Sequence, residues 1–172
     1  MLNSRGQTLI ELLVVVTVAI IVITALVFAT ITSLRNAQLS KNQIQASKYA
    51  QEGIEKVRSI RNRDGEVIFT DAGGPIDKFS GLWDKQLDSS CIDYCYFKLY
   101  RQDRDADGNP DDYLNSETGS SFEDLGGFFQ RQVQMIDNST TYSLEKTINV
   151  IVKWRDFAGE HESKLTTVLG KI

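Results

Sequence analysis

The chain has 172 residues, and its 23 acidic and 19 basic side chains give a formal net charge of −4. This acidic balance argues against a surface dedicated to nucleic acid, so no specific nucleic-acid partner is predicted. The sequence has no phosphate-binding loop, no Gly-x-Ser-x-Gly and no histidine beside a nucleophile motif, so we predict that the protein is not an enzyme. With an apolar N-terminal run set aside, about 110 residues remain, which suits one globular domain.

The apolar run covers residues 12–34 and contains no charged side chain, amide, glycine or proline. About twenty such residues in a helix span the hydrocarbon core of a membrane. The run is longer than the core of a secretory signal peptide, roughly 7–15 residues, and no A-x-A-like cleavage site follows it. Because Arg5 precedes the run, the positive-inside rule places the N-terminus in the cytoplasm. We expect one pass through the cytoplasmic membrane, with the later residues outside it.

The stretch RGQTLIE at residues 5–11 directly precedes the run. An unpaired carboxylate that enters a membrane costs a few kcal/mol, so Glu11 needs a partner. A short basic leader, a glycine, four residues, a glutamate and an apolar run together resemble the class III signal of type IV pilins and pseudopilins. The resemblance implies that prepilin peptidase cleaves the chain between Gly6 and Gln7 and that the new N-terminus, Gln7, is methylated.

The same resemblance implies a role for Glu11 in assembly. Cleavage creates an α-amine at Gln7, which is largely cationic at neutral pH. In this family the glutamate of one subunit pairs with the N-terminal amine of its neighbour in the filament, and the pairing offsets the desolvation of both charges. The alternative is that Glu11 lies in the headgroup layer at little cost. Both can hold, the second before assembly and the first after it.

Two departures from the family pattern concern the start and the middle of the run. Major pilins usually begin with phenylalanine, whereas the mature chain would begin with Gln7, and they often carry a proline where this chain has Phe28. Pro75 and Pro110 both lie outside the run. These differences favour a minor pilin or a pseudopilin over an abundant major subunit.

We expect one helix over residues 9–62. Beyond the apolar run, apolar residues at helical spacing form one stripe, Ala46, Ala50, Ile54, Val57 and Ile60. Gly53 interrupts this segment at a cost of about 1 kcal/mol relative to alanine. The basic side chains near its end suit the negative end of the helix dipole, although contact with DNA is an alternative interpretation: Lys56, Arg58, Arg61 and Arg63. The sequence NRDG at residues 62–65 then stops the helix.

The rest of the chain reads as β-rich. Residues 64–95 show no sustained period, whereas strands are predicted at residues 96–101, 128–136 and 142–155, with a return strand at 161–169. A long helix that covers one face of a small antiparallel sheet is an α+β, pilin-like arrangement. The expected parts are listed by residue range: a cleaved leader at 1–6, the membrane and assembly half of the helix at 7–34, its soluble half at 35–63, and a β-rich globular domain at 64–172.

Cys91 and Cys95 lie in the part of the chain expected outside the cytoplasm, so a disulfide between them is the leading interpretation. The loop that it closes is short, so its stabilising effect should be modest. His161 is the only histidine in the sequence, which argues against a zinc site with these cysteines. We interpret His161 as an ordinary exposed strand residue.

The stretch DRDADGNPDD at residues 103–112 carries oxygen-bearing side chains at alternate positions: Asp103, Asp105, Asp107, Asn109 and Asp111. With Gly108 among them, the pattern resembles calcium loops of the EF-hand and thrombospondin-repeat type, in which alternate carboxylates converge on Ca²⁺. Leu114 stands where an EF-hand has its last glutamate, so the EF-hand fold itself is excluded. The alternative is a solvated acidic hairpin loop. Repulsion between the aspartates favours calcium.

The expected function is that of a structural subunit, a minor pilin or pseudopilin, of a type IV pilus or a related type II secretion or DNA-uptake filament. Its expected partners are other pilin subunits, prepilin peptidase, the pilus assembly platform and the cytoplasmic membrane, and its final location is an extracellular filament. The alternative is a membrane-tethered extracytoplasmic binding or sensor protein that uses the helix as a stalk. Gly6 and Glu11 discriminate between the two, because only filament assembly requires both.

Overall fold

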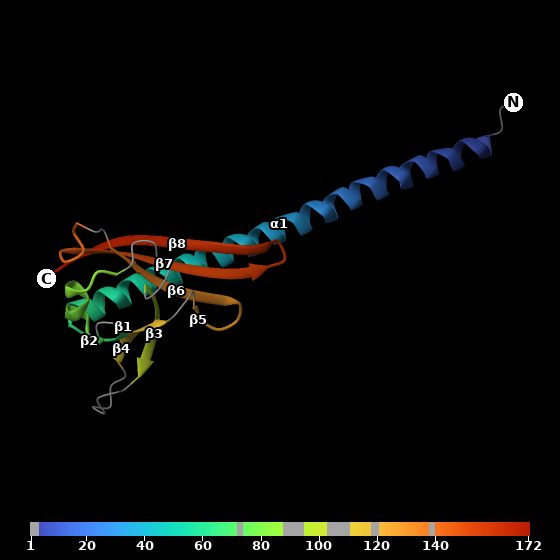
Figure 1. Ribbon diagram of the computed structural model, residues 1–172. Helices are drawn as coiled ribbons and strands as arrows, with labels where there is room; N and C mark the ends of the chain where they lie inside the picture. The colour runs from blue at the N-terminus through green and yellow to red at the C-terminus, as the bar shows by residue number, and fades with distance from the viewer. Residues whose placement is uncertain (1–3, 72–73, 88–94, 103–110, 118–120, 138–139) are drawn as a thin grey trace. The chain divides into compact units, whose positions relative to one another are not determined.

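The computed structural model describes residues 4–71, 74–87, 95–102, 111–117, 121–137 and 140–172 (Figure 1). The chain divides into two compact units, Met1–Asn42 and Gln43–Ile172, which we call the N-terminal unit and the head unit. Helix α1 (Ser4–Asn62) is continuous through the boundary between them. Each unit is therefore described by itself.

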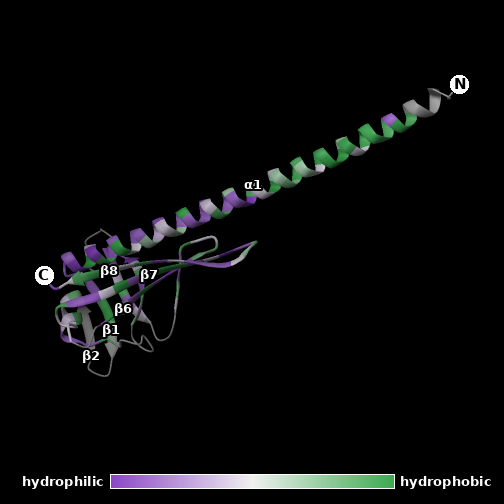
Figure 2. Ribbon diagram, turned by 90° about the horizontal axis from the view of Figure 1, so that it is seen from above, coloured by the Kyte–Doolittle hydropathy of each residue, from purple (hydrophilic) through white to green (hydrophobic). Residues whose placement is uncertain are grey.

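The N-terminal unit consists of the first part of α1. Its apolar residues face outward all round the helix, with exposed fractions from 45% at Ile31 to 73% at Phe28. Figure 2 shows this apolar stretch giving way to a mixture of hydrophilic and hydrophobic residues further along α1. The helix is long and apolar enough to cross a membrane.

The end of α1 is fixed by local hydrogen bonds. The Gly65 amide donates to the Ile60 carbonyl oxygen at 2.7 Å, and Asp64 adopts a positive φ of 51°. A residue in this left-handed conformation closes a helix by turning its last amides back onto free carbonyl groups. The predicted stop at residues 62–65 is thus confirmed.

The head unit adds a sheet and one short helix to the end of α1. Its elements are β1 (Glu66–Asp71), β2 (Gly74–Lys78), the 3₁₀ helix η1 (Phe79–Asp84), β3 (Tyr96–Gln102), β4 (Asp111–Glu117), β5 (Glu123–Asp124), β6 (Phe129–Ile136), β7 (Glu145–Asp156) and β8 (Gly159–Gly170). The described strands form one eight-stranded sheet in the order β2-β1-β4-β3-β6-β7-β8, and β5 pairs with β6.

The four predicted strands are present as β3, β6, β7 and β8, which pair with their sheet neighbours in antiparallel fashion. The region expected to be irregular, residues 64–95, instead contains β1, β2 and η1. The pairing of β1 with β4 is parallel, so the sheet is mixed rather than wholly antiparallel. A parallel pair needs a long connection, and residues that meet only through such a connection carry no hairpin signal in the sequence.

The core lies between α1 and one face of the sheet. All five residues of the predicted helical stripe are buried, together with Ile148, Val150, Val152 and Trp154 of β7. A helix on one face of a sheet is a two-layer α+β arrangement, and the pilin-like fold class is therefore confirmed.

Gly53 lies where α1 packs closely against the sheet. A Cβ atom at this position would lie 2.8 Å from Cγ1 of Val150 and 3.2 Å from Cδ of Arg131. The cost of Gly53 in helix propensity has a packing reason, because the missing side chain lets the helix backbone come close to β6 and β7.

Candidate functional site

The candidate site is the first part of α1, where the sequence motif lies. The predicted cleavage position, Gly6–Gln7, falls near the start of the helix, and Glu11 follows one turn later. Leu9 and the apolar residues after Glu11 are exposed on every side of the helix. A helix that is apolar all round is stable either inside a bundle of helices or in lipid.

Four threonines of the apolar run satisfy their hydroxyl groups within the helix. Thr17 donates to the Leu13 carbonyl oxygen at 2.8 Å, and Thr24 donates to that of Ile20 at 2.7 Å. Thr30 and Thr32 bond in the same way. Such bonds remove the penalty for a hydroxyl in hydrocarbon, so these residues are compatible with a membrane segment.

Glu11 differs from these threonines because it has no partner among the helix side chains that the structure describes, from Leu9 onward. Its side chain is exposed, and within the described part of the chain no hydrogen bond or ion pair engages it. The neighbouring residues are apolar, and the nearest basic residue after it in the sequence is Arg35. A partner for this carboxylate must therefore come from outside the described residues.

The basic residues at the end of α1 bind the rest of the head unit. Arg58 donates to the Thr167 hydroxyl at 3.1 Å, and Arg61 donates to the Gly170 carbonyl oxygen at 3.1 Å, so both contact β8. Arg63 pairs with Asp111 of β4 at 2.6 Å and also donates to the Asp112 carbonyl oxygen. These cations are used within the head unit, which argues against the interpretation as a DNA contact.

Sequence reasoning missed Arg131, which is buried although it is charged. Its guanidinium donates to both carboxylate oxygens of Glu123, each at 3.0 Å, and to the Tyr49 carbonyl oxygen at 3.2 Å. Burial raises the pKa of Glu123, although the Arg131 charge opposes the change. Arg131 thereby joins α1, β5 and β6. Arg131 alternates along β6 with Phe129, Val133 and Met135, which are all buried. This alternation is the sequence signal that could have identified Arg131 as inward-facing.

Most of the predicted calcium ligands lie outside the described residues: Asp103, Asp105, Asp107 and Asn109. Asp111 is described and begins β4, where it pairs with Arg63. Within the described part of the chain, no three His, Cys, Asp or Glu side chains gather as a metal site. The calcium loop stays a prediction.

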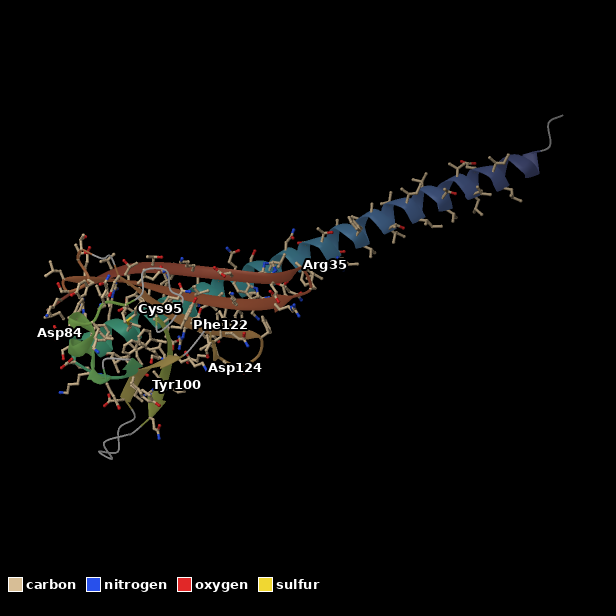
Figure 3. All side chains as sticks on the ribbon, viewed as in Figure 1. Arg35, Asp84, Cys95, Tyr100, Phe122 and Asp124 are labelled. Carbon is tan, nitrogen blue, oxygen red and sulfur yellow. The ribbon has the colours of Figure 1, made fainter. Side chains whose placement is uncertain are left out.

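Cys95 is buried and disulfide-bonded, and its carbonyl oxygen accepts from the Met135 amide at 2.9 Å. Cys91 lies outside the described residues, so the pairing of Cys91 with Cys95 stays a prediction. Figure 3 labels Cys95 beside the sheet.

His161 was predicted to be exposed, but it is partly covered. Its ring stacks on Trp154 with the ring centres 5.3 Å apart, and Nε2 lies 3.0 Å from an Asp156 carboxylate oxygen. These contacts give it a structural role at the end of the β7–β8 hairpin.

Comparison with known proteins gives one match. Residues 1–27 match the family model of the prokaryotic N-terminal methylation motif, the prepilin signal of type IV pilins and pseudopilins. No curated protein and no solved structure matches the chain. The motif covers the predicted cleavage position, Glu11 and the first part of the apolar run. It supports a type IV pilin-like substrate of prepilin peptidase, and it implies assembly with other pilin subunits.

Proposed function

We propose that this chain, a type IV pilin-like substrate of prepilin peptidase, is a minor pilin or pseudopilin of a type IV pilus or a related type II secretion or DNA-uptake filament. The observation that carries the proposal is the combination of the methylation motif with a continuous helix whose apolar residues are exposed all round. Such a helix can lie first in the cytoplasmic membrane and later in a bundle of identical or related helices.

In this proposal cleavage falls between Gly6 and Gln7, and the amine of Gln7 is methylated. Glu11 supplies the charge that sets the stagger between subunits. Its side chain has no partner within the described residues, which supports a partner on another subunit. The amine of a neighbour's Gln7 is such a partner, because a carboxylate and a cation in an apolar bundle offset each other's desolvation. The assembled subunit would then lie outside the cell, with the assembly platform as its partner on the way.

The experiment measures processing and assembly of the Glu11→Leu variant in cells that make the filament. We expect the variant to insert into the membrane at least as well as the wild type, because a charge has been removed from the segment. Its amount in sheared filaments should fall, because the neighbour's amine loses its carboxylate. Mass spectrometry of the wild type should give an N-terminus at methylated Gln7.

Gly6→Leu provides a second arm, in which the precursor should stay uncut in the membrane. Thr8→Ser is a matched control that leaves Gly6, Gln7 and Glu11 in place. The stalk alternative predicts that the Glu11→Leu protein keeps its function. Wild-type amounts of that variant in filaments would rule out the pairing mechanism, and an intact Met1 in the wild type would rule out the pilin-like function.

We also propose that residues 103–111 bind Ca²⁺. Support comes from the alternate carboxylates of the sequence; Asp111 would have to leave its ion pair with Arg63 to serve as a ligand. Carboxylate oxygens at such spacing suit the six to eight ligands that Ca²⁺ takes.

A further inference from the structure

Two exposed phenylalanines lie at one end of the head unit, and a third lies further along the sheet. Phe128 is 49% exposed and Phe157 is 57% exposed, and Phe122 is partly buried. They come from three places in the chain, because Phe122 precedes β5, Phe128 precedes β6 and Phe157 lies in the turn between β7 and β8. We call Phe128 and Phe157 the aromatic end; Phe122, labelled in Figure 3, lies further along the sheet, because β5 places it opposite Gln132, which pairs with Ile151.

Pairing within the sheet places the aromatic end at one end of the strands. Phe129 pairs with Trp154, and Trp154 pairs with His161, so Phe128 lies one residue nearer the β7–β8 turn than this row. The ammonium of Lys153 lies 4.9 Å from the centre of the Phe122 ring, which places Phe122 beside β7.

This is the end of the head unit that carries Gln43. The hydroxyl oxygens of Ser47 and Ser163 are 3.4 Å apart, whereas Arg61 reaches Gly170 at the other end of β8. Strand β8 therefore runs beside the head unit's part of α1 in the same direction (Figure 1). From Ser163 the strand continues back to Gly159 for about 13 Å, while Gln43 precedes Ser47 by only about 6 Å of helix. The β7–β8 turn thus lies at the end of the head unit that carries Gln43.

The charged groups around the aromatic end carry no net positive charge. Arg155 pairs with Glu160 at 2.6 Å, and Lys153 lies 3.9 Å from Glu162. Asp124 and Asp156 add negative charge nearby. The attraction of this surface for a partner therefore comes from its aromatic rings and not from a net positive charge.

The chain itself keeps this end close to lipid. Residues 35–42 separate the apolar run from Gln43. Even fully extended, this link is only about 30 Å long. A short tether gives a weak contact a high effective concentration, so a few rings are enough for binding. Exposed phenylalanines are also the side chains that enter the boundary between headgroups and acyl chains.

We propose that the aromatic end docks on the outer surface of the phospholipid bilayer that holds α1, with Phe128 and Phe157 inserted at the level of the headgroups. The contact orients the head unit while the subunit waits in the membrane, and it is lost when the subunit leaves the bilayer. The proposal rests on the membrane-anchored state in the proposed function and is independent of incorporation into a filament.

The test uses the full chain, labelled with 4-fluorophenylalanine, in phospholipid nanodiscs that hold one copy each. The eight phenylalanines include the reporters Phe128 and Phe157, and Phe28 in the apolar run. Phe69 and Phe97 are buried in the core and serve as matched controls. Lipids carrying a nitroxide on the headgroup should broaden the ¹⁹F signals of Phe128 and Phe157 and leave Phe69 and Phe97 sharp. Lipids with the nitroxide on the acyl chain should broaden Phe28.

A pair of variants separates the aromatic contact from other surfaces. In Phe128→Ser/Phe157→Ser, the broadening of Phe122 by headgroup nitroxide should be lost. Leu144→Ser should leave it unchanged, because Leu144 is 64% exposed but precedes β7, at the opposite end of the sheet. Unchanged signals of Phe69 and Phe97 show that each variant is folded.

The pattern of broadened signals distinguishes the docking proposal from the proposed function. A broadened Phe28 with sharp Phe128 and Phe157 overturns the docking proposal and leaves the proposed function intact. A sharp Phe28 overturns both, because the helix is then not in the membrane. Broadening of the aromatic end that vanishes at high salt overturns aromatic insertion in favour of charge attraction. A further comparison uses a water-soluble nitroxide with nanodiscs that hold one copy or several copies. Protection of the Phe128 signal only in nanodiscs with several copies identifies a second copy of the chain as the partner and also overturns the proposal.

Discussion

Lys146 and Asp137 form an ion pair in the head unit, and both side chains are fully buried. The Lys146 ammonium donates to both oxygens of Asp137, at 3.0 and 2.8 Å, and to the Lys85 carbonyl oxygen at 3.1 Å. Asp137 also accepts from the Leu87 amide at 2.7 Å. Burial lowers the pKa of Lys146, although Asp137 opposes the change. The pair holds the segment after η1 against the ends of β6 and β7.

Removal of one member of this pair should be strongly destabilising. We expect Asp137→Ala to lower the free energy of unfolding by about 3–5 kcal/mol, because it leaves a buried charge without its partner. The measurement is urea unfolding of the full chain in detergent micelles, followed by the fluorescence of Trp83 and Trp154, which both lie in the head unit.

The matched control replaces both members, in Lys146→Met/Asp137→Leu. No charge is then left buried, and the remaining loss should be about 1–3 kcal/mol, because the Leu87 amide still lacks its acceptor. A larger loss in the double variant than in Asp137→Ala would contradict this account of the pair.

Gly53→Ala gives a prediction that opposes helix propensity. Alanine is the better helix former by about 1 kcal/mol, but its Cβ would lie 2.8 Å from Cγ1 of Val150, a branched side chain in the core. We expect the substitution to lower the free energy of unfolding by about 1–3 kcal/mol, as overpacking does. In a Val150→Ala background the same change should cost less, and equal costs in both backgrounds would show that the contact is not the cause.

At the scale of elements, a chain of charges links α1 to the sheet. Glu52 of α1 pairs with Lys56 at 2.8 Å and lies 3.7 Å from Arg131 of β6, which binds Glu123 of β5. The hydrogen bond from Lys56 holds the pKa of Glu52 below its ordinary value of 4.5, whereas burial raises the pKa of Glu123 above it. The contributions of the two carboxylates to the free energy of unfolding therefore change with pH in opposite directions.

The stability of the helix–sheet contact should depend on pH accordingly. Because the folded-state pKa of Glu52 is lowered, its contribution is present above pH 4.5 and is lost as pH falls through the folded value. The contribution of Glu123 has the opposite sign: it is present below its unfolded value and is lost as pH rises through its raised pKa. We expect Glu52→Gln to make the loss of unfolding free energy on acidification shallower.

Glu123→Gln should do the reverse and make stability rise more steeply with pH above 4.5, because it removes the opposing contribution. Urea unfolding at a series of pH values checks both variants. Thr166→Val is a control on exposed β8 that removes no titrating group. Parallel pH profiles for the two glutamine variants would contradict the assignment of opposite shifts.

At the scale of the whole molecule, the calcium proposal can be tested by melting. If residues 103–111 bind Ca²⁺, the full chain should melt at a higher temperature with calcium than with a chelator. The gain at a hundredfold excess over Kd is about 2.7 kcal/mol. Asp105→Asn/Asp107→Asn should abolish it, while Asp112→Asn, outside the proposed ligand set, should keep it. Equal melting temperatures of the wild type with calcium and with chelator would contradict the calcium proposal and favour a solvated acidic loop.

The sequence by itself determined the features that rest on local pattern. Each of these features is visible within a short stretch of sequence: the motif at residues 5–11, the apolar run, the stripe of α1 and the alternation in β7. They can therefore be recognised without knowing which distant residues they contact. The same holds for the end of α1, because Asp64 and Gly65 close the helix on its own last turn.

Only the tertiary structure decided which residues meet across long stretches of chain. The parallel pairing of β1 with β4, the burial of Arg131 against Tyr49 and the contact of Gly53 with Val150 each join residues more than 40 positions apart. A charged side chain or a glycine has the same local signature whether it is exposed or buried. Its role is set by the neighbour that the fold brings to it, because burial makes an ion pair obligatory and close packing makes a missing side chain necessary.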